Sequence, residues 1–176
     1  MQRTQAHFFP GARPAPPLDA WLQVPEDCCS GLYKCRVIYA KNVLHAEFHH
    51  YIPRPVRRLK LVVDDAIDYA WKFEDRSALN HLFAQKGDCD DVLIVKNGLL
   101  SDSSYSNLAF YDGSSWHTPE TPLLRGVQRE RLLRDGLLHT ASIRVEDLKA
   151  FSKIALINAM LELGDCVVDM EVGIEY

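Results

Sequence analysis

The chain has 176 residues, of which 47% are hydrophobic, so it is long enough for one ordinary domain or two small lobes with a buried core. Its 20 basic and 24 acidic residues give a net charge of −4, which argues against nucleic acid or an anionic membrane as the main partner. No apolar run approaches membrane-spanning length and the first residues lack the apolar stretch of a signal peptide, so we expect a cytosolic protein.

The cysteines are odd in number and show no CxxC spacing, which favours free thiols in a reducing compartment. We therefore expect neither a disulfide framework nor a zinc site, and we assign no chemistry to the cysteines. They are Cys28, Cys29, Cys35, Cys89 and Cys166.

Residues 1–30 are rich in proline and have no sustained hydrophobic period, so we predict an irregular arm. Residues 33–40 and 42–52 then indicate two strands joined by a short turn at Lys41 and Asn42. In the second strand His45, Glu47 and His49 point to one face. Such a trio could bind a metal, but no further ligand cluster accompanies it, and we interpret it as the polar outer face of a half-buried sheet.

The next segment, "PRPVRRLKLV", carries a basic cluster. An anion site is one interpretation of this cluster. We favour a solvated edge segment, because Pro53 and Pro55 disrupt regular strand pairing. The basic residues are Arg54, Arg57, Arg58 and Lys60.

The second half alternates helices and strands. Leucines at helical spacing predict a helix over residues 76–85, and a short apolar run between turn signals predicts a buried strand at Val92 to Val95. Residues 105–119 read as a hairpin around Asp112 and Gly113. Later elements are a helix over 127–134 with Gly136 as its C-cap, a short helix over 145–151, and strands within 153–160 and 166–174.

Three features could serve one chemistry. Lys72, in "DYAWKFEDRSALNHL", is either a solvated charge or an amine that forms a Schiff base. Gly126 precedes a helix whose first amides could hold a phosphate, although many helices start after a glycine. Asp102, in "NGLLSDSSYSN", either caps a turn in a serine-rich loop or provides a carboxylate for a pyridine nitrogen.

In this order the segments resemble the class IV aminotransferase family, the fold type IV enzymes that use pyridoxal 5′-phosphate. The resemblance rests on "WKFEDRSALNHL", with its lysine and an arginine four residues later, and on residues 90–133. Residues 90–133 contain, in the family's order, a glycine, an acidic residue and the patterns Asn-Leu-x-Phe, Thr-Pro and Gly-x-x-Arg. "LINAM" is similar to the aminodeoxychorismate lyase branch.

The resemblance covers roughly residues 31–165 and implies a mixed α/β (α+β), two-lobed architecture like that of D-amino-acid aminotransferase. We predict an N-terminal strand-rich lobe over 1–71, an interdomain segment over 72–87 and a C-terminal α/β lobe over 88–176. The resemblance also implies a homodimer. Its expected activity is 4-amino-4-deoxychorismate lyase; a branched-chain or D-amino-acid aminotransferase and a non-catalytic remnant remain open.

The resemblance also implies roles for single residues. Lys72 would be the Schiff-base lysine and proton-transfer base. Arg36 could supply a substrate contact, although a strand arginine of this kind is more often a surface charge. Asn107 and Thr118 would shape the site. The cofactor contacts would be Arg76, Asp102, Gly126, Val127, Gln128 and Asn158. For Arg76 a structural ion pair is an equal alternative.

Two departures from the family are visible. The family usually has glutamate where this chain has Asp102, and the shorter side chain changes the reach of the carboxylate. The family's Glu-Thr-x-Arg and His-x-x-Arg segments, the second of which supplies an arginine to the cofactor phosphate, are not found. The start "MQRTQAHFFP" looks like the stretch that follows them, so we expect Met1 to be an internal methionine and the N-terminal lobe to be incomplete, with an exposed sheet edge.

Overall fold

A computed structural model describes residues 1–13, 16–41 and 44–176, and the chain divides into two compact units, Met1–Pro53 and Arg54–Tyr176. This boundary precedes the one that we predicted at residue 71. The reason is strand β3 (Leu59–Val63), which pairs in parallel with β4 (Asp91–Lys96) and so belongs to the second unit.

The first unit begins with a helix, α1 (Gln2–Phe8), so the prediction of an irregular arm is wrong at these residues. The segment contains neither proline nor glycine, and the prolines of the arm begin at Pro10. Beyond α1 the arm forms two short 3₁₀ turns, η1 (Leu18–Ala20) and η2 (Glu26–Cys28), before the first strand.

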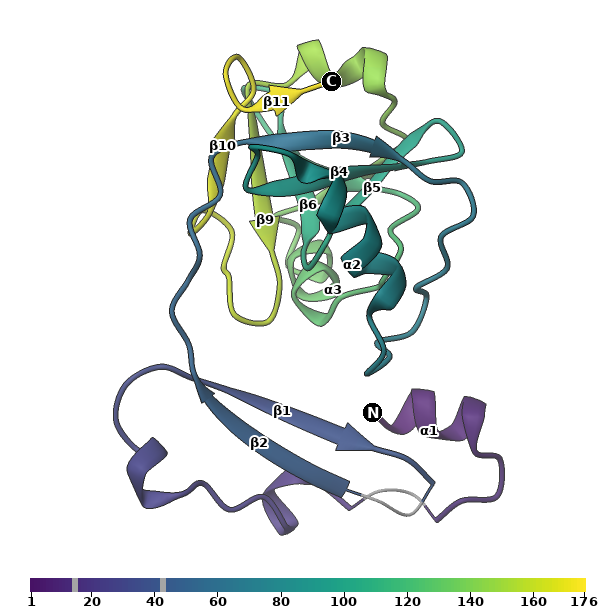
Figure 1. Ribbon diagram of the computed structural model, residues 1–176, viewed down its shortest axis with the longest axis vertical. Helices are drawn as coiled ribbons and strands as arrows, with labels where there is room; N and C mark the ends of the chain where they lie inside the picture. The colour runs from purple at the N-terminus through teal and green to yellow at the C-terminus, as the bar shows by residue number, and fades with distance from the viewer. Residues whose placement is uncertain (14–15, 42–43) are drawn as a thin grey trace. The chain divides into compact units, whose positions relative to one another are not determined.

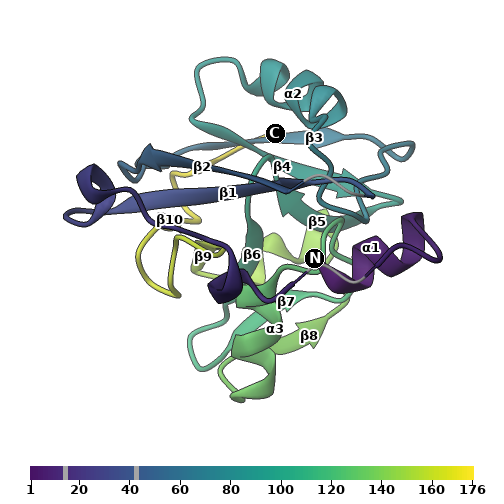
Figure 2. The same ribbon diagram turned by 90° about the horizontal axis from the view of Figure 1, so that it is seen from below.

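The predicted strand pair is confirmed as the antiparallel hairpin of β1 (Tyr33–Tyr39) and β2 (Leu44–His50), seen in Figure 2. The shared face of β2 is confirmed as well. His45 and His49 lie 3.6 and 3.1 Å from Glu47, and Arg36 on β1 reaches the same carboxylate at 3.2 Å. Of the predicted turn residues, Asn42 lies outside the described part of the chain.

In the second unit, whose residues 54–176 are all described, nine strands form one mixed sheet in the order β10-β9-β6-β5-β4-β3-β11 (Figure 1). Off this path, β7 pairs with β6 and β8 pairs with β7 (Figure 2). The remaining strands are β5 (Leu99–Ser103), β6 (Asn107–Tyr111), β7 (Trp116–Pro119), β8 (His139–Ala141), β9 (Lys153–Ile157), β10 (Val167–Asp169) and β11 (Ile174–Glu175). The helical segments are α2 (Ser77–Phe83), η3 (Ala84–Lys86), α3 (Val127–Arg134) and η4 (Val145–Ala150). The predicted mixed α/β class is confirmed.

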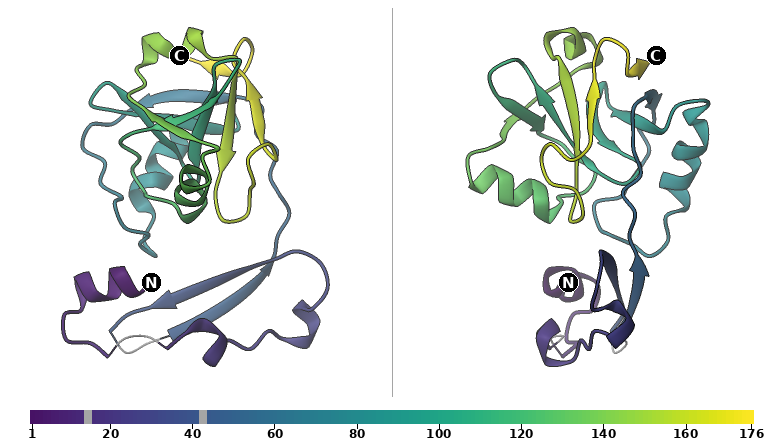
Figure 3. Two further views of the ribbon diagram at one scale, coloured as in Figure 1. Left: turned by 180° about the vertical axis from the view of Figure 1, so that it is seen from behind. Right: turned by 90° about the vertical axis from the view of Figure 1, so that its left-hand side faces the viewer.

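Helices α2 and α3 lie on opposite sides of this sheet (Figures 2 and 3). On one side Leu79 and Leu82 of α2 pack against Ile94 of β4, and on the other Leu132 of α3 packs against Ile157 of β9. The helices predicted over 76–85 and 127–134 are thus confirmed, because each presents a short apolar stripe to the sheet. The short helix predicted over 145–151 is the 3₁₀ helix η4. Helix α3 ends at Arg134 and its C-cap is Asp135, one residue before the predicted cap Gly136, which has a φ of 72°.

Two predictions about strands are corrected. The basic segment is not a solvated edge, because β3 pairs with β4 on one side and β11 on the other, and both Val56 and Leu59 are buried. The prolines Pro53 and Pro55 precede the strand instead of interrupting it. Asp102 does not lie in a loop, because it belongs to strand β5. Among the described residues no helix is both long and apolar enough to span a membrane.

Candidate functional site

Asp102 is the buried acid at the centre of the candidate site, with only 4% of its surface exposed. In the β5–β6 ladder it stands opposite Asn107. Its Oδ1 accepts a hydrogen bond of 2.8 Å from Asn107 Nδ2, and its Oδ2 accepts one of 2.9 Å from the backbone N–H of Leu124. The carboxylate is therefore held from both sides, by the next strand and by the loop that leads into α3.

The electrostatic state of Asp102 follows from this enclosure. Burial raises the pKa of the carboxyl from 3.8 to about 6, even though the N–H donors of Leu124 and Asn107 and the positive charge of Arg129 lower it. Its two hydrogen-bond partners are uncharged. A cationic group placed against the carboxylate would therefore be favourable.

Asn107 also connects Asp102 to the start of helix α3. The same Nδ2 donates a second hydrogen bond, of 2.7 Å, to the carbonyl of Leu124. A β-carbon on Gly126 would lie 2.2 Å from Asn107 Oδ1, so only glycine fits at this point. We predicted that Gly126 would let the backbone approach a phosphate; its observed close neighbour is the Asn107 side chain.

Helix α3 begins directly after Gly126, which is its N-cap and provides no side-chain cap. The first amides of a helix have no acceptor within the helix, so Val127 and Gln128 present donors there. The Val127 side chain is 75% exposed, and the Gln128 side chain is buried with its Nε2 2.7 Å from Glu162. The predicted phosphate cradle therefore has the donors that an anion needs.

Arg129, to which we gave no separate role from the sequence, fastens α3 to strand β7. It is buried, and its guanidinium donates to Thr118 Oγ1 at 3.2 Å and to the carbonyl of Pro119 at 2.8 Å. Burial lowers the pKa of this guanidinium. The sequence signal for Arg129 was the Gly-x-x-Arg pattern. In the structure this arginine binds the Thr118 and Pro119 of the Thr-Pro pattern.

Lys72 is exposed and lies in the segment between β3 and α2. Four residues later, Arg76 donates a hydrogen bond of 2.6 Å to the carbonyl of Ser104, in the turn that follows Asp102. A cavity of about 270 Å³ nearby is lined by Ala70, two residues before Lys72, and by Leu123, the neighbour of Leu124. Neither Lys72 nor Asp102 lines that cavity, which lies beside the candidate site.

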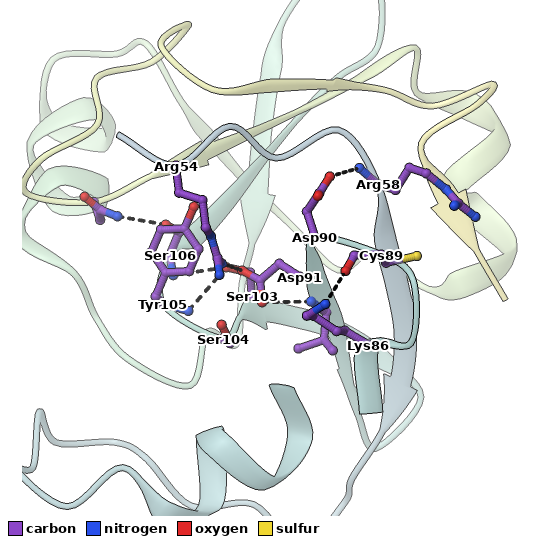
Figure 4. A network of polar contacts seen from close by, with 12 residues as sticks. Arg54, Arg58, Lys86, Cys89, Asp90, Asp91, Ser103, Ser104, Tyr105 and Ser106 are labelled. Carbon is purple, nitrogen blue, oxygen red and sulfur yellow. Dashed lines mark hydrogen bonds and ion pairs between the residues drawn. The ribbon is translucent and has the colours of Figure 1, made fainter. Parts of the chain in front are cut away.

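The turn of residues 103–106 is anchored from both sides. The Arg54 guanidinium lies 5.2 Å from the Tyr105 ring centre, 5.1 Å from that of Phe83 and 3.7 Å from the buried Asp91 carboxylate. Figure 4 shows Arg54 beside Tyr105 and Asp91. Ser106 Oγ accepts a hydrogen bond of 2.8 Å from Asn158. Because this turn joins β5 to β6, these contacts stabilise the strand ends that carry Asp102 and Asn107.

The structure thus gathers most of the predicted residues, although not through direct contacts with one another. Asp102 and the first turn of α3 are joined through Asn107 and Leu124. Arg76 and Asn158 both bind the turn of residues 103–106. Arg36 lies in the first unit, on β1, and contacts Glu47.

Substitution of Gly126 by alanine is expected to lower the free energy of unfolding by about 1–3 kcal/mol, because the new methyl group would overlap Asn107 Oδ1. Urea unfolding at constant pH measures the change. The control is Val127→Ala, at an exposed side chain in the next position, with an expected effect within about 0.5 kcal/mol. Equal effects of the two substitutions would show that the contact is not tight.

The raised pKa of Asp102 predicts a pH-dependent stability of the cofactor-free protein. Since the folded state binds the proton more tightly than the unfolded chain, this contribution is fully present below pH 3.8 and is lost as the pH rises through about 6. The loss amounts to about 3 kcal/mol. Urea midpoints from pH 4 to 8 should fall more steeply for the wild type than for Asp102→Asn, and parallel curves would contradict the assignment.

Comparison with known proteins gives three relevant similarities. A family model described as amino-transferase class IV matches residues 50–167. A protein of Haemophilus influenzae without an assigned activity is 41% identical over 139 residues, which cover 79% of this chain and 74% of that protein. The crystal structure of a Haemophilus somnus 129pt protein, provisionally described as a 4-amino-4-deoxychorismate lyase, has a TM-score of 0.80 and 34% identity, covering 92% of this chain and 85% of that one.

A more distant similarity concerns the fold alone. The PLP-bound form of a hypothetical aminotransferase from Mycobacterium tuberculosis has a TM-score of 0.59 and 16% identity, covering 74% of this chain and 54% of that one. This similarity shows that the two chains share a fold; the bound pyridoxal phosphate belongs to the Mycobacterium tuberculosis protein.

Proposed function

The chain belongs to the class IV aminotransferase family, and we propose that it is a pyridoxal-phosphate enzyme with 4-amino-4-deoxychorismate lyase activity. The observation that carries this proposal is the buried Asp102 carboxylate, hydrogen-bonded to the segment that leads into the uncapped N-terminus of α3. The similarity to the Haemophilus somnus protein supports the lyase activity in particular. A homodimer, as in the family, is part of the proposal.

The described residues fit the cofactor on chemical grounds. The Asp102 carboxyl is buried and its direct hydrogen-bond partners are uncharged, so a protonated pyridine nitrogen would supply a positive charge in direct contact with it. The uncapped amides of Val127 and Gln128 would bind the phosphate through the N-terminus of α3. Asn158 and Arg76 would support the wall of the site from the turn of residues 103–106.

Lys72 would hold the cofactor through its ε-amino group and, once released by the incoming substrate amine, would accept the proton from the substrate Cα. Pyridoxal phosphate, when bound, supplies an electron-withdrawing ring that makes this proton removable. Asp102 would keep the positive charge on the ring nitrogen, because its carboxylate is desolvated and fixed by two N–H donors. Arg36 is the proposed contact for a substrate carboxylate.

In the lyase reaction the substrate would lose pyruvate and become the aromatic 4-aminobenzoate, and the gain of aromaticity would drive the step. An aminotransferase of the same family would instead return the proton and pass the amino group to a 2-oxo acid. The two activities therefore differ in their products, although both use the same lysine and carboxylate.

The test is a product assay of the purified chain with pyridoxal phosphate. One arm follows pyruvate and 4-aminobenzoate from 4-amino-4-deoxychorismate, and the other follows amino-group transfer from branched-chain and D-amino acids to 2-oxoglutarate. The expected result is equal amounts of pyruvate and 4-aminobenzoate. Transfer without pyruvate release would identify an aminotransferase, and no product from the cofactor-loaded protein in either arm would favour a non-catalytic remnant.

A further inference from the structure

We propose that Asn107 is a positioning residue that fixes the Asp102 carboxylate relative to the N-terminus of α3. It would thereby set the spacing between the two parts of the site that bind the opposite ends of the cofactor. The inference rests on the proposed function, since it concerns the same site, but the contacts that carry it belong to the chain alone.

The first step is the use of one amide group for two partners. Asn107 Nδ2 donates to Asp102 Oδ1 at 2.8 Å and to the carbonyl of Leu124 at 2.7 Å. The N–H of Leu124 donates a hydrogen bond of 2.9 Å to Asp102 Oδ2, so Asn107, Asp102 and Leu124 form a closed ring of hydrogen bonds. A primary amide carries two hydrogens on one nitrogen, which aspartate lacks and serine only half provides.

The second step is the contact on the other side of the same amide. Asn107 Oδ1 lies where a β-carbon of Gly126 would be, only 2.2 Å from that ideal position. Gly126 is the N-cap of α3, so the oxygen of Asn107 is packed against the residue that starts the helix. One side chain therefore touches the carboxylate, the preceding loop and the helix start.

The third step is the burial of the whole arrangement. Asp102 and Asn107 are 4% and 6% exposed, so water cannot easily replace a lost hydrogen bond. Arg129 adds a nearby positive charge but binds Thr118 and Pro119 instead of the carboxylate. Asn107 is thus the side chain that contacts the Asp102 carboxylate directly and holds it by a hydrogen bond.

The experiment compares Asn107→Leu with Leu108→Ala. Leucine has the same number and branching of side-chain heavy atoms as asparagine, although it is bulkier, and it has no donors. Leu108→Ala removes core packing from the same strand and leaves the Asn107 amide intact. If Asn107→Leu does not fold, Asn107→Ser replaces it, since a serine hydroxyl offers only one short donor.

Two measurements follow. In the cofactor-free protein, the carboxyl ¹³C titration of Asp102, assigned with Asp102→Asn, reports the pKa, which should rise above about 6 in Asn107→Leu and stay unchanged in Leu108→Ala. Binding of pyridoxal phosphate is then compared with binding of pyridoxal, which lacks the phosphate. Asn107→Leu should reduce the advantage of the phosphorylated form by about tenfold or more.

The proposal is overturned if the Asp102 pKa is the same in Asn107→Leu as in the wild type, or if both ligands weaken by the same factor. Leu108→Ala should leave the ratio of the two Kd values unchanged. If the wild type binds neither ligand, the proposed function fails, and the cofactor-free titration alone decides whether Asn107 holds Asp102.

Discussion

Replacement of Lys72 by alanine is expected to lower turnover of the cofactor-supplemented protein by about 10³-fold or more, because the variant lacks the amine that we propose as both the cofactor anchor and the base at the substrate Cα. Lys72 is exposed and lies in a segment without regular structure, so the folded state should persist. Steady-state product formation measures the loss, and urea unfolding checks the fold.

A matched control is Lys149→Ala, which removes another exposed lysine, from the short helix η4. Its turnover should stay within about twofold of the wild type, as expected for surface substitutions away from a site. Added ethylamine should restore part of the activity of Lys72→Ala, because a free amine can replace a missing base. Turnover of Lys72→Ala within tenfold of the wild type would rule out the proposed role.

Asp102→Asn is expected to reduce turnover by about 10²- to 10⁴-fold, because a neutral amide does not stabilise a positive charge on the ring nitrogen. The amide NH₂ of the new asparagine would also face one of the two N–H donors, that of Asn107 or that of Leu124, and could not accept its hydrogen bond. At pH values where the Asp102 carboxyl is protonated, the variant should therefore be less stable than the wild type. The turnover number at saturating cofactor and substrate is the measurement that isolates the chemical effect.

The control for this variant is Asp90→Asn. Asp90 also accepts two N–H groups, those of Arg57 and Arg58 at 2.7 and 3.0 Å, but it lies outside the candidate site. Both N–H groups donate to the same oxygen, Asp90 Oδ2, so the amide oxygen of asparagine can accept both, and the substitution removes mainly a negative charge. Turnover of Asp90→Asn should stay within about threefold of the wild type. Equal losses of turnover in the two variants would mean that the loss in Asp102→Asn is not specific to the candidate site.

The elements predicted correctly are those whose signal is local. Leu79 and Leu82 recur at helical spacing, and Asp112-Gly113 is a turn pair that joins two short apolar runs, so α2 and the β6–β7 hairpin follow from a few neighbouring residues. Strand β5 has no such signal, because Ser101, Asp102 and Ser103 are polar and become buried only when β4 and β6 flank them. Strand β3 was missed for a related reason: its partners β4 and β11 are distant in the chain.

The candidate site also has features that the sequence predicts and features that it does not. The order of the family patterns pointed to Lys72, Asp102 and Gly126, and it could do so because residue types and spacing are visible in one sequence. The sequence does not show which side-chain atoms form hydrogen bonds with one another. The double donation by Asn107 and the anchoring of Arg129 at Thr118 depend on the register of β5, β6 and β7, which pairing across the sheet determines.

The most direct measurement is the visible absorption spectrum of the purified chain with pyridoxal phosphate, recorded before and after borohydride reduction and followed by peptide mapping. We predict an absorption band that reduction bleaches and a single reduced label on Lys72. The absence of a band, or a label scattered over several surface lysines, would contradict the proposal that this chain binds the cofactor through Lys72.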